Sequence, residues 1–90
     1  MKIRLSKDLV TALQEINRKD YILITRINKQ LKLFQESPHH PSLRTHKLTG
    51  KLQNRWSISI TKDIRMVYII VKQNEAYFVA IGTHDMVYRK

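Results

Sequence analysis

The sequence predicts an α+β fold in which an N-terminal helical hairpin packs on one face of a small antiparallel β-sheet, in the order β-α-α-β-β-β. Between residues 6 and 36, apolar residues recur at intervals of three and four, which is typical of amphipathic helices. Between residues 56 and 81, β-branched and aromatic residues form three runs separated by turns, which is typical of an antiparallel meander. The 90 residues are enough for one modest core and too few for two, so residues 1–90 are predicted to form a single domain.

The N-terminal segment predicts a strand followed directly by a helix. Residues 2–5 alternate basic and apolar side chains, as a short edge strand does. Ser6 is then expected to cap a helix that runs to about Arg18, because serine oxygens accept hydrogen bonds from first-turn amides. The apolar face of this helix would carry Leu9, Ala12, Leu13 and Ile16.

A second helix is predicted from a cap at Asp20 to about Glu36. Pro38 ends it, because the residue before a proline avoids the α region. Neither Gly nor Pro separates the two helices, so a single long bent helix is the alternative to a hairpin. The apolar face of the second helix would carry Ile24, Ile27, Leu31 and Phe34.

Residues 37–53 contain both prolines, three of the four histidines and Gly50, without clean periodicity, and predict a loop and a candidate site. Three strands follow: residues 56–60, a central strand over 64–71 that begins after a Lys62-Asp63 turn, and residues 76–81. Their alternation places Trp56 on the apolar face of the sheet. The polar face, which is a candidate ligand surface, would carry Ser57, Ser59, Thr61 and Arg65.

Charge indicates a polyanionic partner. The sequence has 17 Lys and Arg against 7 Asp and Glu, a formal net charge of +10, and no acid from Ser37 to Lys62. A surplus of Lys can also serve solubility alone, so charge nominates a class of partner and no reaction. The predicted RNA-binding residues are Arg44, Lys47, Lys51, Arg55, Ser59 and Lys62.

Several functional classes are excluded or disfavoured. Without cysteine, the chain can form neither a disulfide framework nor a thiol nucleophile nor a zinc–thiolate site, and this fits a reducing cytoplasm. Neither a signal peptide nor a membrane span is predicted, because no apolar run is long enough. The histidine spacing matches no recognised metal motif, so no metal and no cofactor are expected.

Five residues near predicted strand ends and turns form a candidate catalytic set: His46, Asp63, Arg65, His84 and Tyr88. RNA is cleaved without metal when a base removes the 2′-hydroxyl proton and an acid protonates the departing 5′-oxygen. Imidazole suits both transfers, because its pKa lies near the working pH. An arginine can stabilise the phosphorane, and a tyrosine can stack on a base. Taken singly, each residue also has an ordinary structural explanation, as a turn former, a strand-end cation or part of the core.

Four ordered motifs carry a resemblance to a known family. They are His46-Lys-Leu-Thr-Gly50, Trp56-Ser-Ile, Asp63-Ile-Arg65-Met-Val-Tyr68 and Ile81-Gly-Thr-His84-Asp-Met-Val-Tyr88. In these motifs and in its element order, the chain resembles the RelE/ParE toxin superfamily, with the YafQ-type toxins as the most similar branch. The resemblance implies a RelE-like fold and an mRNA endonuclease that contacts mRNA in the ribosomal A site and rRNA. It also implies a cognate antitoxin that inhibits the toxin in a hetero-oligomer.

The resemblance also implies roles for individual residues. His46 and Asp63 would share base and positioning work, His84 would be the acid, and Tyr88 matches the family's aromatic residue. The chain departs from the YafQ-type pattern at Ser59, where those toxins carry a histidine. Arg65 would compensate, because RelE and YoeB relatives place an arginine on this strand for the phosphate.

Two other functions compete with ribosome-dependent cleavage. ParE-type members of the superfamily poison DNA gyrase and do not depend on this histidine set. A basic RNA-binding module without catalysis would use the sheet face and aromatic residues only to hold RNA. The presence of both His46 and His84 favours cleavage.

Overall fold

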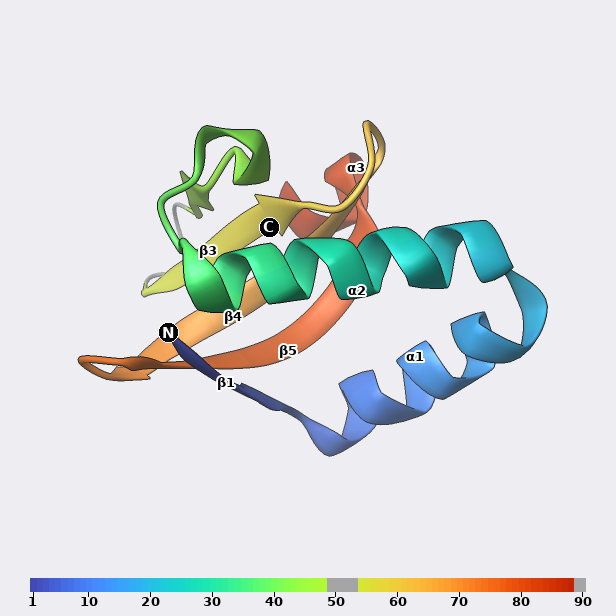
Figure 1. Cartoon of the computed structure of the whole chain (residues 1–90), viewed down its shortest axis with the longest axis horizontal. Helices are drawn as coiled ribbons and strands as arrows, with labels where there is room; N and C mark the ends of the chain where they lie inside the picture. Colours follow the sequence, from blue (N-terminus) through green and yellow to red (C-terminus); the bar gives the residue numbers. More distant parts are fainter. Residues whose placement is uncertain (49–53, 89–90) are drawn as a thin grey trace.

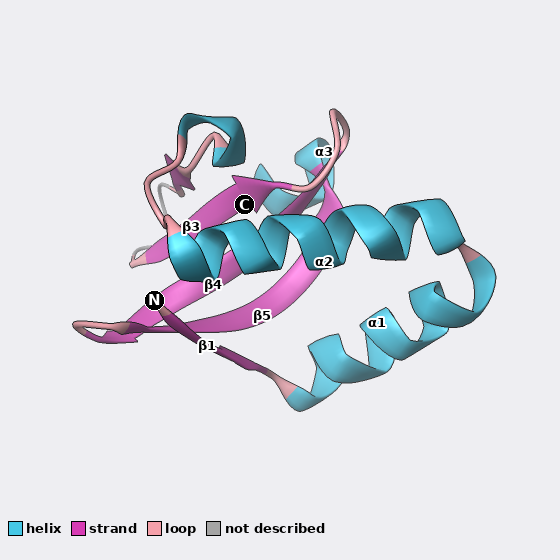
Figure 2. Ribbon diagram, in the orientation of Figure 1, coloured by secondary structure: helices cyan, strands magenta, loops and turns pink. Residues whose placement is uncertain are grey.

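The computed structural model describes residues 1–48 and 54–88. They form a five-stranded sheet with the strand order β1-β5-β4-β3-β2, and helices α1 and α2 lie across one face of it (Figures 1 and 2). The predicted α+β architecture is therefore confirmed. The elements are β1 (Lys2–Leu5), α1 (Lys7–Lys19), α2 (Tyr21–Glu36), the 3-10 helix η1 (Pro41–Leu43), β2 (His46–Lys47), β3 (Arg55–Ser59), β4 (Ile64–Lys72), β5 (Glu75–Thr83) and α3 (His84–Tyr88).

The two N-terminal helices form a hairpin, as predicted, and the single bent helix is wrong. Ser6 caps α1 by accepting a hydrogen bond from the Leu9 amide at 3.1 Å. Asp20 has a non-helical backbone and serves both helices: its N–H donates to the carbonyl of Ile16, and its carboxylate accepts from the Leu23 amide at 3.0 Å. One aspartate thus ends α1 and begins α2 without a glycine or proline.

The strands match the predicted meander, with one parallel addition. β3, β4 and β5 pair antiparallel in sequence order, and β4 lies at the centre of the sheet. β1 is an edge strand, as predicted, but it pairs parallel with β5. β5 is also longer than predicted, because its pairing with β4 continues to Thr83.

The prediction of a structureless loop over residues 37–53 is wrong for part of its length. Residues 41–43 form η1, which His40 caps by accepting a hydrogen bond from the Ser42 amide at 3.1 Å. Leu43 is completely buried in the main core. Three residues after Leu43 the chain forms β2, which pairs with β3. Residues 49–53 lie outside the described part of the chain.

Two apolar clusters occupy the two faces of the sheet. The main core lies between the helices and the sheet, where the Phe34 ring contacts Tyr68 and Phe78 with ring centroids 4.9 and 5.2 Å apart. Trp56 packs against this core, as predicted. The smaller cluster contains Leu48, Val67 and Val87 and joins α3 to the opposite face. In the described residues, no helix is long and apolar enough to span a membrane.

Candidate active site

The ends of β3 and β5 and the start of β4 meet at one end of the sheet, and this is where most predicted catalytic residues lie. On β4, Arg65 pairs with Ser59 of β3 on one side and with Gly82 of β5 on the other. The His84 amide donates a 3.0 Å hydrogen bond to the carbonyl of Asp63. The turn before β4 is therefore fixed against the start of α3, and the exposed side chains of Asp63 and His84 come from adjoining segments.

Arg65 is a buried cation within this site. Only 9% of its surface is exposed. Its Nε donates to Ser57 Oγ at 2.9 Å, and its Nη2 donates to the carbonyls of Arg44 at 2.6 Å and Ser57 at 3.3 Å. Hydrogen bonds from a guanidinium are charge-assisted and geometrically fixed. Arg65 thus supplies a permanent, oriented positive charge next to the loop before β2.

His46 belongs to the same face of the sheet. It pairs with Ser57 across the β2–β3 ladder, and directly paired residues of antiparallel strands project to the same side. Ser57 in turn accepts the Arg65 bond, so His46 and Arg65 flank one buried serine. The neighbouring Ile58 is buried in the main core, so this shared face is the one directed away from α1 and α2.

Lys47 lies on the other side of the sheet. It pairs with Trp56, and its ammonium lies 5.7 Å from the centroid of the Trp56 ring, a cation–π contact. The predicted basic face is therefore divided between the two sides of the sheet. Arg44, in contrast, lies beside Arg65 in a left-handed backbone conformation with φ 46°, and its side chain is exposed.

The remaining predicted site residues are Ser59, Lys62, Tyr88 and Lys51. Ser59 donates from its Oγ to the carbonyl of Thr61 at 2.9 Å, and Lys62 is exposed in the turn before β4. Tyr88 lies in the same short helix, α3, as His84. Lys51 lies outside the described residues.

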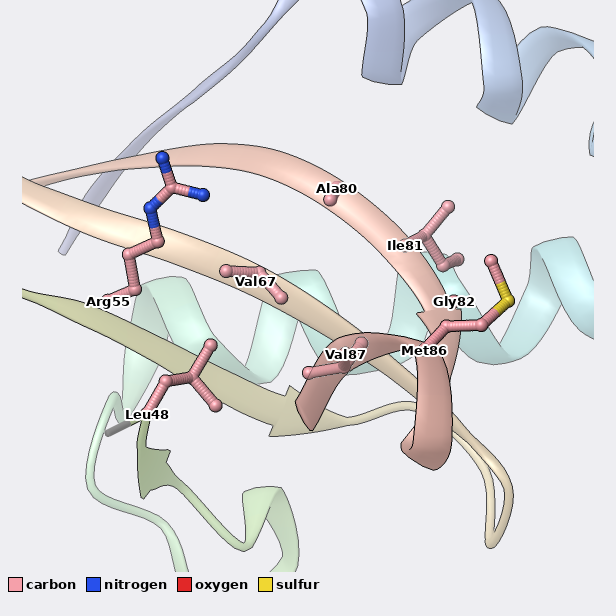
Figure 3. A pocket seen from close by; sticks show the side chains of 8 residues that line it. All are labelled: Leu48, Arg55, Val67, Ala80, Ile81, Gly82, Met86 and Val87. Carbon is pink, nitrogen blue, oxygen red and sulfur yellow. The ribbon is translucent and has the colours of Figure 1, made fainter. Parts of the chain in front are cut away.

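A pocket of about 220 Å³ lies between α3 and the sheet, on the side opposite α2 (Figure 3). Arg55 points along its rim, and among the described residues it is the one predicted site residue in the lining. His46, Arg65 and His84 are not among the lining residues. Its lining consists of Leu48, Arg55, Val67, Ala80, Ile81, Gly82, Met86 and Val87.

Sequence reasoning did not identify Gln30 as a site-related residue. It is buried on α2, and its Nε2 donates to the carbonyl of Ser59 at 2.8 Å and lies 3.5 Å from that of Ser42. A signal was present, because Gln30 follows Ile27 by three residues and precedes Phe34 by four, on the apolar face of the helix. A polar residue at a core position usually has a hydrogen-bonding reason.

Tyr68 is a titratable group that lies outside the candidate site. Burial raises the pKa of Tyr68 to about 12, but this ring belongs to the main core on the helix side. His84 Nδ1 lies 3.9 Å from an Asp85 carboxylate oxygen, at the long limit for an exposed pair. Within residues 1–48 and 54–88, no three His, Asp or Glu side chains gather as a metal-binding group.

No protein-family model matches the sequence, and no curated protein matches it. Solved structures do match. A YoeB/ParE toxin from Agrobacterium tumefaciens superposes with a TM-score of 0.78 at 20% identity over 93% of this chain and 99% of the other. The YoeB–YefM complex from Staphylococcus aureus superposes with a TM-score of 0.76 at 20% identity, over 93% of this chain and 97% of the other. YafQ from E. coli gives 0.70 at 15% identity over 97% of both chains.

These similarities show the fold and do not distinguish YoeB-like from YafQ-like proteins. The YoeB and YafQ structures both cover nearly the whole chain, and the TM-scores do not favour the YafQ branch that the sequence motifs suggested. At these identities the comparison concerns the backbone. The described residues therefore have the RelE-like α+β fold, with a helical hairpin on a mostly antiparallel five-stranded sheet.

Proposed function

We propose that this chain is the toxin of a type II toxin–antitoxin pair and that it cleaves mRNA in the ribosomal A site without a metal ion. Two observations support the proposal: Asp63, Arg65 and His84 come from adjoining segments at one end of the sheet, and His46 lies on the same sheet face as Arg65, with Ser57 between them. Two imidazoles, a carboxylate and an oriented guanidinium are the groups that acid–base cleavage of RNA requires.

In the proposed reaction, His46, assisted by Asp63, removes the proton from the 2′-hydroxyl. The 2′-oxygen then attacks the adjacent phosphorus, the bond to the 5′-oxygen breaks, and His84 donates a proton to that oxygen. The products are a 2′,3′-cyclic phosphate and a free 5′-hydroxyl. In this proposal Arg65 stabilises the extra negative charge of the phosphorane, and Tyr88 stacks on a base.

The proposed site combines features of two branches. His46, Asp63 and His84 follow the YafQ-type spacing, whereas Ser59 replaces that branch's additional histidine and Arg65 follows the RelE and YoeB pattern. The similarity to both YoeB and YafQ structures is consistent with such a combination.

An antitoxin is the proposed protein partner, and mRNA and rRNA are the proposed nucleic-acid partners. The S. aureus YoeB of the same fold was solved as a complex with YefM, described as a heterotetrameric toxin–antitoxin complex. The net charge of +10 suits binding to ribosomal RNA. Activity on translating ribosomes would place the chain in the cytoplasm.

The test is primer extension on an mRNA in a translating extract, with wild-type protein, His84→Ala and His39→Ala. His39 is an exposed histidine outside the catalytic set and provides a matched control. We expect codon-phased cuts with wild type and His39→Ala and none with His84→Ala. A wild-type protein that blocks gyrase supercoiling and leaves mRNA intact would refute the proposal, as would one that binds RNA tightly without cutting it.

A further inference from the structure

Gln30 connects the helical hairpin to two segments that carry the site. Its Nε2 donates to the carbonyl of Ser59 at 2.8 Å and approaches the carbonyl of Ser42 at 3.5 Å. Ser59 is the last residue of β3, just before the turn that contains Asp63, and Ser42 lies in η1, four residues before His46. A primary amide has two N–H donors, so one side chain can serve both carbonyls.

The segment that carries His46 depends on such contacts for its position. β2 has only two residues, and beyond its ladder the Leu48 amide donates to the Arg55 carbonyl at 2.8 Å. Leu43 anchors the segment in the main core. Arg65 holds the Arg44 carbonyl from the face away from the helices, while Gln30 holds Ser42 from the helix side.

We infer that Gln30 is a positioning residue for the proposed cleavage. It ties the η1–β2 segment, and with it His46, to the end of β3 and the following turn, and with it Asp63. The inference rests on the proposed function, because it assigns Gln30 the task of setting the separation of two reacting groups. Gln30 lies on the buried face of α2 and is not itself placed to touch RNA.

The activity test uses Gln30→Met, which keeps the length and volume of the side chain and removes both N–H donors. Gln35→Met makes the same change at an exposed position of the same helix. Displacement of reacting groups by about 1 Å can cost on the order of 100-fold in rate. We therefore expect kcat of Gln30→Met to fall about 10- to 100-fold with KM within about threefold of wild type.

The comparison is made at a temperature where urea titration shows both variants fully folded, so that loss of folded protein is excluded. Gln35→Met should retain the wild-type kcat. A Gln30→Met protein that cleaves with the wild-type kcat, or that loses activity only through KM, overturns the positioning role.

Amide hydrogen exchange tests the same inference without any activity. In Gln30→Met, the Leu48 amide should exchange about tenfold faster, because the η1–β2 segment opens more often. The Ser6 amide, which donates to the Phe78 carbonyl at the β1 edge, should keep its wild-type rate. Unchanged exchange at Leu48 overturns the inference. If the wild-type protein does not cleave RNA, the proposed function fails, and exchange still decides whether Gln30 holds the segment.

Discussion

The carbonyl oxygen of Arg44 accepts a 2.6 Å hydrogen bond from Nη2 of Arg65, which ties a left-handed loop residue to the central strand. The same guanidinium donates to the buried Ser57 side chain through Nε. Arg65 therefore links two strands and the segment before β2. The hydrogen bonds by which Arg65 holds the loop also fix the orientation of its charged guanidinium.

Replacement of Arg65 by Met should lower the free energy of unfolding by about 2–3 kcal/mol, because it leaves buried acceptors without their charged donor. Arg65→Lys should recover part of that loss, since an ammonium cannot reproduce the fork of a guanidinium. Urea denaturation measures both variants. Arg26→Met, at an exposed position of α2, is the control and should stay within about 0.5 kcal/mol of wild type. Equal stability of Arg65→Met and wild type would contradict the bonding described for Arg65.

A substrate with sulfur in place of the scissile 5′-oxygen should show which histidine is the general acid and which is the general base. A thiolate leaves without protonation, so the general acid becomes dispensable. On the normal mRNA, His46→Gln and His84→Gln should each cleave about 100- to 10,000-fold more slowly than wild type. On the sulfur-containing mRNA, His84→Gln should recover most of the wild-type rate and His46→Gln should not. Recovery of His46→Gln instead would reverse the two roles.

The division of the basic residues between two faces predicts different salt responses. RNA affinity can be measured against KCl concentration in a His84→Gln background. Arg44→Gln and Arg55→Gln should each reduce the slope of log affinity against log KCl concentration by about 1, because each removes one phosphate contact. Lys47→Gln should leave the slope nearly unchanged, since Lys47 lies over Trp56 on the helix side. An equal effect of all three variants would indicate that RNA contacts both sides of β2.

The fold was largely predictable because its signals are local. Ser6, Asp20 and Pro38 mark the ends of helices through their own side chains or backbone restrictions, and strand alternation placed Trp56 toward the core. β2 and η1 were missed because their signals are not local. Two residues show no periodicity, and β2 exists only through its pairing with β3.

The sequence supplies the residue types of the candidate site but not the surroundings of those residues. The register of three strands, β2, β3 and β4, decides that His46 and Arg65 share Ser57 and that Lys47 lies on the other face. A shift of one residue in β2 would exchange these faces, and the sequence of a two-residue strand does not specify its register. Gln30 also acts through contacts distant in sequence, 12 and 29 residues away.

Burial of Tyr68 predicts a loss of stability in alkali. Its pKa is raised from 10.0 in the unfolded chain to about 12 in the folded protein, because desolvation disfavours the phenolate. The unfolded state therefore loses the proton first as pH rises. The contribution of Tyr68 is fully present below pH 10 and is lost between pH 10 and about 12. Urea midpoints across this range should fall less steeply for Tyr68→Phe than for wild type. Tyr21→Phe, at a ring that is 81% exposed, controls for the loss of one phenol.

The junction between α1 and α2 predicts a stability effect that is separable from activity. Asp20→Ala removes the carboxylate that accepts from the Leu23 amide and should lower the free energy of unfolding by about 1 kcal/mol. Asp20→Asn should lose less, because its side-chain oxygen can still cap α2. The Asp20 backbone bond to Ile16 is retained in both variants, so the hairpin should persist by circular dichroism. Cleavage should be unchanged below the unfolding transition, because the cap lies outside the candidate site. An Asp20→Ala protein as stable as wild type would mean that packing of the helices on the sheet, and not the side-chain cap, determines where α2 begins.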